Sequence, residues 1–341
     1  MKKSLIALAV LAASGASFAQ STVTIYGTVD VALANVASTG ATTQNLLYSS
    51  GVSSSNFGFK GSEDLGGGLK ANFKLEQGFD VDTGAAHVAG TAFSRYAYVG
   101  VSGAFGEVQL GKNGTPYDDI QNATDAAFAS NALSPIGGAA GAFRSALNYD
   151  WTVANTIKYI APAIGGFNGA LSYSLKENKS ATVDAGSVVS LNATYATGPV
   201  FVGFAYQAEK ANGSVDSINF TRLNASYDLK VATLLGSYGK ASNNGAGVGV
   251  LLSGASTNEW SLGANFPVGK ALTLSAGYAA STDDANTAAV ETKRTAYSLA
   301  GAYSLSKRTT AYAGYTSGTS TPNGGADTTT TVLAAGIKHT F

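Results

Sequence analysis

The segment Leu69-Lys-Ala-Asn-Phe-Lys-Leu-Glu76 decides the fold class, because its side chains alternate between apolar and polar without interruption. Successive side chains of a β-strand point to opposite faces of a sheet, whereas a helix would repeat with a period of 3.6 residues. The segment therefore predicts a strand with one apolar face and one hydrophilic face.

Segments of the same kind recur along most of the chain, and hardly any stretch has a helical period. We predict about sixteen strands, an even number typical of single-chain bacterial membrane barrels. One predicted strand is irregular, because Ile218 and Phe220 share a face with Arg222 and Asn224, and a bulge would explain this. The predicted strands span 22–35, 54–62, 68–80, 92–102, 105–113, 153–160, 166–176, 187–197, 199–210, 214–228, 230–242, 254–266, 270–281, 291–304, 308–318 and 331–341.

The connections between these strands alternate between short and long. Tight turns such as Gly103-Ala104 and Gly198-Pro199 separate long polar loops such as 36–53 and 243–253. A soluble sandwich has no reason to sort its turns in this way, whereas a membrane barrel places short turns in the periplasm and long loops outside. The pattern predicts an all-β fold, a 16-stranded antiparallel transmembrane β-barrel.

The N-terminus predicts export. Residues 1–19 have a basic start, an apolar run from Leu5 to Ala13 and a Ser17-Phe18-Ala19 end, which is the pattern of a cleaved secretory signal peptide. Residues 20–341 would then form the barrel. The last predicted strand ends on Phe341, and a terminal aromatic of this kind is typical of outer-membrane proteins.

Composition excludes several other classes of function. The chain has no cysteine and two histidines, so we expect no disulfide, no metal site and no cofactor. Basic and acidic side chains number 21 each, which gives no sign of nucleic-acid binding. Charged residues make up 12% of the chain, against about 25% in an average soluble protein.

The connection at 113–152 is much longer than the others, and it mixes acids with small and apolar residues. A loop longer than about 15 residues is usually functional or disordered. We predict that this third long loop folds into the barrel and forms a pore constriction. The alternative is a flexible excursion on the surface.

Six segments resemble the Gram-negative general porins of the β-proteobacterial branch, and they are spread from one end of the chain to the other: Val23-Thr-Ile-Tyr-Gly-Thr-Val-Asp30, Ser55–Ala71, Leu75-Glu-Gln-Gly-Phe79, Gly103–Lys112, Asn155-Thr-Ile-Lys-Tyr-Ile-Ala-Pro162 and Gly336-Ile-Lys-His-Thr-Phe341. The resemblance implies a homotrimer in the lipid bilayer of the outer membrane, with sixteen strands and an inward-folded third loop. The implied function is a water-filled channel for ions and small hydrophilic solutes.

If the apolar faces meet lipid, the other parity lines the lumen. This places five charged candidates on the inner wall, and Asp30 and Glu107 share their parity: Lys70, Lys74, Glu76, Arg95 and Lys158. Lys112 and Arg144 would reach the constriction from the long loop, while Asp118, Asp119 and Asp125 would form an opposing acidic rim. Because the wall candidates are mainly basic, we expect a weak preference for anions.

Three other functions are open at this stage. A channel selective for organic acids would need a continuous basic ladder, and the basic residues are scattered. An adhesin or structural anchor would carry an added domain. An enzyme would need a nucleophile beside a base, and no such set occurs.

Overall fold

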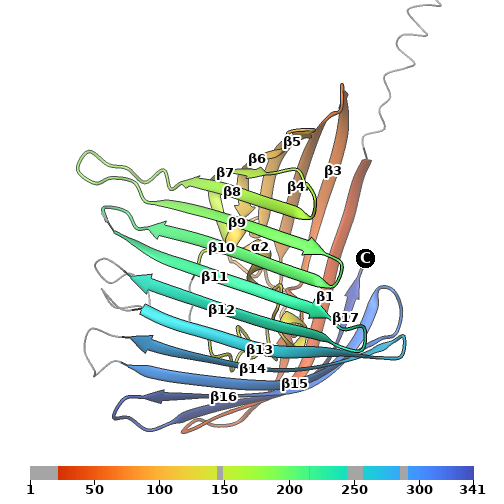
Figure 1. Cartoon of the computed structure of the whole chain (residues 1–341), viewed down its shortest axis with the longest axis vertical. Helices are drawn as coiled ribbons and strands as arrows, with labels where there is room; N and C mark the ends of the chain where they lie inside the picture. Colours follow the sequence, from red (N-terminus) through yellow and green to blue (C-terminus); the bar gives the residue numbers. More distant parts are fainter. Residues whose placement is uncertain (1–21, 144–148, 215, 244–255, 285–290) are drawn as a thin grey trace, which may run out of the picture.

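The structure is a computed structural model that describes residues 22–143, 149–214, 216–243, 256–284 and 291–341. Antiparallel strands form one sheet that closes on itself into a barrel (Figure 1). The predicted signal peptide lies outside the described residues. The strands are β1 (Thr22–Ser38), β2 (Gln44–Ser49), β3 (Asn56–Gly66), β4 (Leu69–Gly78), β5 (Tyr96–Gly103), β6 (Gly106–Gly114), β7 (Thr152–Ile160), β8 (Phe167–Leu175), β9 (Ser187–Thr197), β10 (Val200–Lys210), β11 (Ser217–Asp228), β12 (Thr233–Asn243), β13 (Ser256–Val268), β14 (Leu272–Asp284), β15 (Thr292–Ser304), β16 (Thr309–Pro322) and β17 (Thr328–Thr340).

The seventeen strand segments of the described chain occupy sixteen positions around the barrel. β3 pairs with β1 along 22–28 and β2 pairs with it along 31–36, so β2 and β3 lie end to end as one interrupted strand. On its other side β1 pairs with β17, which closes the barrel. The predicted sixteen-stranded antiparallel barrel is confirmed, although β2 lies in a stretch that the sequence pattern assigned to a loop.

The outward face of the barrel is apolar, as the alternation predicted. Large hydrophobic side chains such as Leu33, Leu262 and Leu333 are more than half exposed, because they point away from the lumen. Inward positions carry small or polar residues, among them Ser190, Asn224 and Thr316, which are buried. A membrane barrel needs this inversion of the soluble pattern, since its outer surface contacts hydrocarbon.

The irregular side-chain pattern of the predicted strand 214–228 has a different cause from the bulge that the sequence suggested. β11 pairs with β10 and β12 without any register shift, so no bulge is present. Phe220, Arg222 and Asn224 all face inward and are fully buried. An apolar residue is accommodated on the inner face because Phe220 packs against Tyr117, a residue of the long loop, with ring centroids 6.1 Å apart.

The long connection between β6 and β7 lies inside the ring of strands (Figure 1). We call it the inner loop; it comprises residues 115–151, of which 144–148 are not described. It contains the helix α2 (Pro116–Gln121) and the short 3₁₀ turn η1 (Ala127–Ala129). No helix of the described chain is long and apolar enough to cross a membrane.

Candidate functional site: the lumen beside the inner loop

The inner loop begins with α2, which lies against the inside of the wall. Two side chains of β9 bind its first turn: the Oγ of Ser190 accepts from the N–H of Tyr117 at 2.9 Å, and the Nδ2 of Asn192 donates to the carbonyl of Pro116 at 2.7 Å. The helix starts on proline, whose missing N–H would be unpaired in a first turn anyway. The hydroxyl of Ser190 thus binds an N–H group that would have no partner at a free helix end.

Further along, the loop covers a buried ion pair of the wall. Arg222 of β11 and Glu259 of β13 have no exposed surface, and their charged groups approach to 3.7 Å. Arg222 also donates to the carbonyl of Gln121 at 3.1 Å, and its guanidinium lies 5.0 Å from the ring of Phe143. Gln121 lies in the first part of the loop and Phe143 in the part that returns to β7, so Arg222 holds both parts against the wall. Loss of Glu259 would leave the buried charge of Arg222 without its ion-pair partner, which is costly.

The rest of the loop follows the inside of β14 to β16. Ser275 accepts from the N–H of Ala127 at 2.7 Å, and Thr316 donates to the carbonyl of Leu133 at 2.5 Å. Ser281 donates to the carbonyl of Ala142 at 2.6 Å. The loop therefore covers a large part of the inner wall, whereas the inside of β3 and β4 still exposes charged side chains.

We call one group of charged side chains the wall cluster: Lys60 of β3, Lys74 and Glu76 of β4, and Arg95, which directly precedes β5. Glu76 is 4% exposed and holds the cluster together. Its carboxylate binds the Nζ of Lys74 at 3.1 Å and the Nε of Arg95 at 2.6 Å, and it accepts from the hydroxyl of Tyr26 at 2.8 Å. One acid thus orients two cations that line the lumen.

Each cation of the wall cluster also rests on an aromatic ring. The Nζ of Lys74 lies 3.6 Å from the ring centroid of Tyr96, and the guanidinium of Arg95 lies 4.9 Å from that of Trp151. Lys60 lies 5.0 Å from the ring of Tyr26 and directly opposite Lys74 in the β3–β4 register. Cation–π contacts hold these flexible chains near the wall without neutralising their charge.

The inner loop contributes two acids near the wall cluster, Asp118 and Asp119. Asp119 binds Lys158 of β7, with 2.7 Å between Oδ2 and Nζ, and Lys158 also donates to the carbonyl of Gly114 at 3.0 Å. Asp118 accepts from the hydroxyl of Tyr149 at 2.5 Å. Burial raises the pKa of Asp118 to about 6, and the hydrogen bond from Tyr149 partly opposes that rise. The charge of Arg95 also lowers the pKa of Asp118, which indicates that this loop acid lies near the wall cluster.

The structure brings together six of the ten residues predicted for the constriction: Lys74, Glu76, Arg95, Asp118, Asp119 and Lys158. It places three others elsewhere. Lys70 is exposed beside the short turn that begins β4, and Lys112 lies in the bulge between Gly111 and Asn113. Asp125 is buried between the loop and the wall. Arg144 lies outside the described residues.

Asp125 has a structural environment unlike that of an exposed rim acid. One carboxylate oxygen accepts from the hydroxyl of Ser134 at 2.5 Å, and the other has no hydrogen-bond partner in the described chain. Burial raises the pKa of Asp125 to about 7. Its position inside the folded loop suits a role in loop packing.

The sequence reasoning missed Lys60 and the rings of Tyr26, Tyr96 and Trp151. Lys60 could have been found, because it alternates with the outward Phe57 and Phe59 on a predicted strand. The aromatic contacts had no signal in the sequence, since they join residues from β1, β3, β4, β5 and the loop.

A closed barrel of outward-apolar strands, with a loop folded into a charged lumen, defines a channel of the outer-membrane type. Comparison with known sequences agrees, because the sequence profile of the Gram-negative porins matches residues 5–323. The chain belongs to the Gram-negative porin family.

Individual relatives extend this result over nearly the whole chain. Outer membrane porin protein 32 of Delftia acidovorans is 37% identical over 321 residues, covering 92% of this chain and 88% of the relative. The solved anion-selective porin from Comamonas acidovorans superposes with a TM-score of 0.78 at 28% identity, covering 94% and 100% of the two chains. The trimer form of OmpT of Vibrio cholerae, at 18% identity, a TM-score of 0.70 and coverage of 94% and 99%, shares the fold.

The chain is therefore an outer-membrane channel for passive diffusion, and its predicted family and location are confirmed. The relatives are porins, which are channels rather than enzymes.

Proposed function

We propose that this porin is a water-filled channel for ions and small hydrophilic solutes, with a weak preference for anions. Its narrowest passage would lie between the wall cluster and the acids of the inner loop. As in its relatives, the lumen would perform no bond chemistry, so pore width and fixed charge would set what passes.

The charge balance at this passage carries the proposal. Four cations, Lys60, Lys74, Arg95 and Lys158, face three acids, Glu76, Asp118 and Asp119. Glu76 and Asp119 form ion pairs with these cations. The pKa of Asp118 is raised to about 6, so this acid loses its negative charge just below neutral pH. The anion-selective porin from Comamonas acidovorans supports the same sign of preference.

The test is single-channel recording of the purified protein in a planar lipid bilayer under a KCl gradient. We expect large ohmic steps and a reversal potential of the sign that reports anion preference. A cation-selective reversal potential would contradict the charge argument. A folded, inserted protein that conducts nothing would contradict the channel itself and favour an adhesin or structural anchor.

The same recordings can separate a general channel from one selective for organic acids. A saturable block of chloride current by a dicarboxylate would favour the selective channel, because saturation requires a binding site. A current that falls only in proportion to the added solute would favour general diffusion.

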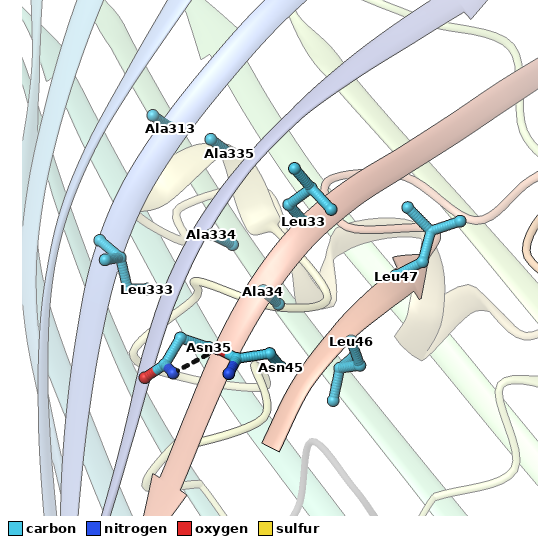
Figure 2. Close-up of a pocket in the computed structure, with 10 residues that line it drawn as sticks. All are labelled: Leu33, Ala34, Asn35, Asn45, Leu46, Leu47, Ala313, Leu333, Ala334 and Ala335. Atoms are coloured by element: carbon cyan, nitrogen blue, oxygen red, sulfur yellow. Dashed lines mark hydrogen bonds between the residues drawn. The ribbon is translucent and has the colours of Figure 1, made fainter. Parts of the chain in front are cut away.

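We also propose that the chain assembles as a homotrimer, as its sequence resemblance implies. The outer face of β1, β2, β16 and β17 supports this assembly, because it has a hollow of about 610 Å³. Figure 2 shows Leu33, Leu47 and Leu333 around the small residues Ala313 and Ala335. Beside them the side chains of Asn35 and Asn45 share a 2.7 Å hydrogen bond, and polar groups of this kind suit a protein interface better than hydrocarbon (Figure 2).

The oligomeric state tests this assembly directly. We expect light scattering in detergent to give the mass of three chains, and Ala335→Arg to lower that mass. Ala225→Arg is the matched control, because Ala225 is exposed on the outer face of β11, away from the hollow. A single-chain mass for the unmodified protein would contradict the trimer.

A further inference from the structure

A single buried carboxylate organises the break between β2 and β3. Asp30 of β1 faces inward and has no exposed surface. Its Oδ1 accepts from the N–H of Gly51 at 3.0 Å and from the hydroxyl of Tyr312 at 2.5 Å. Its Oδ2 accepts from the N–H groups of Val52 at 3.1 Å and Ser53 at 2.8 Å. The residues between the two strands thus wrap around one side chain.

The same break receives the tip of the inner loop. The carbonyl of Gly51 accepts from the Oγ of Ser130 at 2.6 Å and from the N–H of Ala132 at 2.9 Å. The carbonyl of Ser50 accepts from the Nδ2 of Asn131 at 2.8 Å. Asp30 therefore binds the amide side of this short segment while the loop tip binds its carbonyl side.

The fit around Gly51 is close. A Cβ at this position would overlap the hydroxyl of Tyr312, the group that donates to Asp30. The backbone at the break is consequently held between Asp30, Tyr312 and the loop tip. A shift of Gly51 would move the one carbonyl that accepts hydrogen bonds from both Ser130 and Ala132 of the loop.

The inner loop reaches the break between β2 and β3 through a strained turn. Ala127, Phe128 and Ala129 all have positive φ, at 53°, 64° and 51°, a conformation that residues other than glycine rarely adopt and almost never in succession. Such strain persists only where the surroundings fix the backbone on both sides. Here Ser275 binds the N–H of Ala127 at the start of the turn, and the carbonyl of Gly51 binds Ser130 immediately after it.

We propose that Asp30 is the positioning residue that sets the width of the pore, by holding the break against which the tip of the inner loop docks. This inference rests on the proposed function, in which the inner loop narrows the channel. Loss of the Asp30 contacts would release the tip, the strained turn would relax, and the loop would leave its narrow position.

The test uses Asp30→Asn in the full-length protein, with single-channel conductance and liposome swelling as readouts. Asparagine has nearly the same shape, but its NH₂ group replaces one of the two carboxylate oxygens and cannot accept a hydrogen bond. The substitution therefore removes either the bonds from Val52 and Ser53 or those from Gly51 and Tyr312. We expect a larger or fluctuating open-channel conductance, and a severalfold faster entry of solutes that the unmodified pore admits slowly. A purely structural role would lower the yield of folded barrel without changing conductance per channel.

The matched control is Asp283→Asn, because Asp283 is a wall acid held by Arg294 through two contacts of 2.9 and 2.7 Å, away from the loop tip. If Asp30→Asn does not fold, Tyr312→Phe and Ser130→Ala each remove one donor from the same arrangement, and we expect both to widen the pore to a lesser degree. If the unmodified protein conducts and these variants keep its conductance and solute cut-off, the role of Asp30 is overturned and the proposed function is not. Unmodified protein that does not conduct would overturn the proposed function instead.

Discussion

Neutralising Glu76 by Glu76→Gln should strengthen the preference of the channel for anions. Glu76 is the one acid among the three cations of the wall cluster, so the substitution raises the cluster's formal charge from +2 to +3. Glutamine keeps the shape and one acceptor oxygen, which can still bind Tyr26 or Arg95.

The size of the effect follows from Coulomb's law. A unit charge at about 5 Å from a passing ion is worth about 0.8 kcal/mol in water. Screening over a Debye length of about 10 Å at 0.1 M salt reduces this to about 0.5 kcal/mol. Because the change favours anions and disfavours cations together, the anion-to-cation permeability ratio should rise by about fivefold at most and by about twofold if only one ion responds.

The assay is the reversal potential under a salt gradient, measured at two ionic strengths. Glu63→Gln serves as the control, because Glu63 is exposed near the turn end of β3 and is not part of the wall cluster. We expect the effect of Glu76→Gln to shrink at high salt. A folded variant whose reversal potential is unchanged, or shifts toward cations, would show that Glu76 does not face the ion path.

Three further predictions concern the inner loop. The pKa of Asp118 lies at about 6, so its negative charge disappears as the pH falls from 7 to 5; anion preference should rise over that range, and Asp118→Asn should abolish the pH step in the reversal potential. Burial raises the pKa of Asp125 to about 7, above its unfolded value, so its contribution to stability is complete below about pH 4 and is lost as the pH rises through 7; thermal unfolding should show this decline, and Asp125→Asn should flatten it. A Cβ at Gly318 would overlap the carbonyl of Ala140, so Gly318→Ala should push the returning arm of the loop inward, cost about 1–3 kcal/mol, and lower the conductance of the channels that fold; unchanged conductance with full stability would contradict this.

Much of the barrel could be predicted because alternation is a local property. Each strand shows its own two faces, so the parity of Leu69 to Glu76 identified both the lipid side and the lumen side. The inward position of the loop was predicted from the barrel pattern of the whole chain, because its length alone would favour a flexible excursion on the surface. The short β2 could not be predicted, because its pairing with β1 depends on the interruption that Asp30 organises through hydrogen bonds to Gly51, Val52 and Ser53.

The candidate site was predictable only in part, for a different physical reason. Parity tells which side of the wall a residue faces, but not whether the inner loop covers it. Arg222 and Lys74 both face inward; the loop buries Arg222 completely, whereas Lys74 keeps about a quarter of its side chain exposed. Asp125 was assigned to the rim with Asp118, and the fold of the loop turned it toward Ser134 instead.

The pairing of β1 with β17 has a consequence for how this protein is made. The first strand of the chain hydrogen-bonds to the last along eleven residue pairs, and Gly27 and Phe341 exchange backbone hydrogen bonds beyond them. The barrel cannot close until its C-terminal residues have been synthesised and delivered to the membrane. Until then β1 and the latest strand present two unpaired edges, which are templates for association with other chains. Loss of the final strand should therefore leave an open sheet prone to aggregation, and not a smaller barrel.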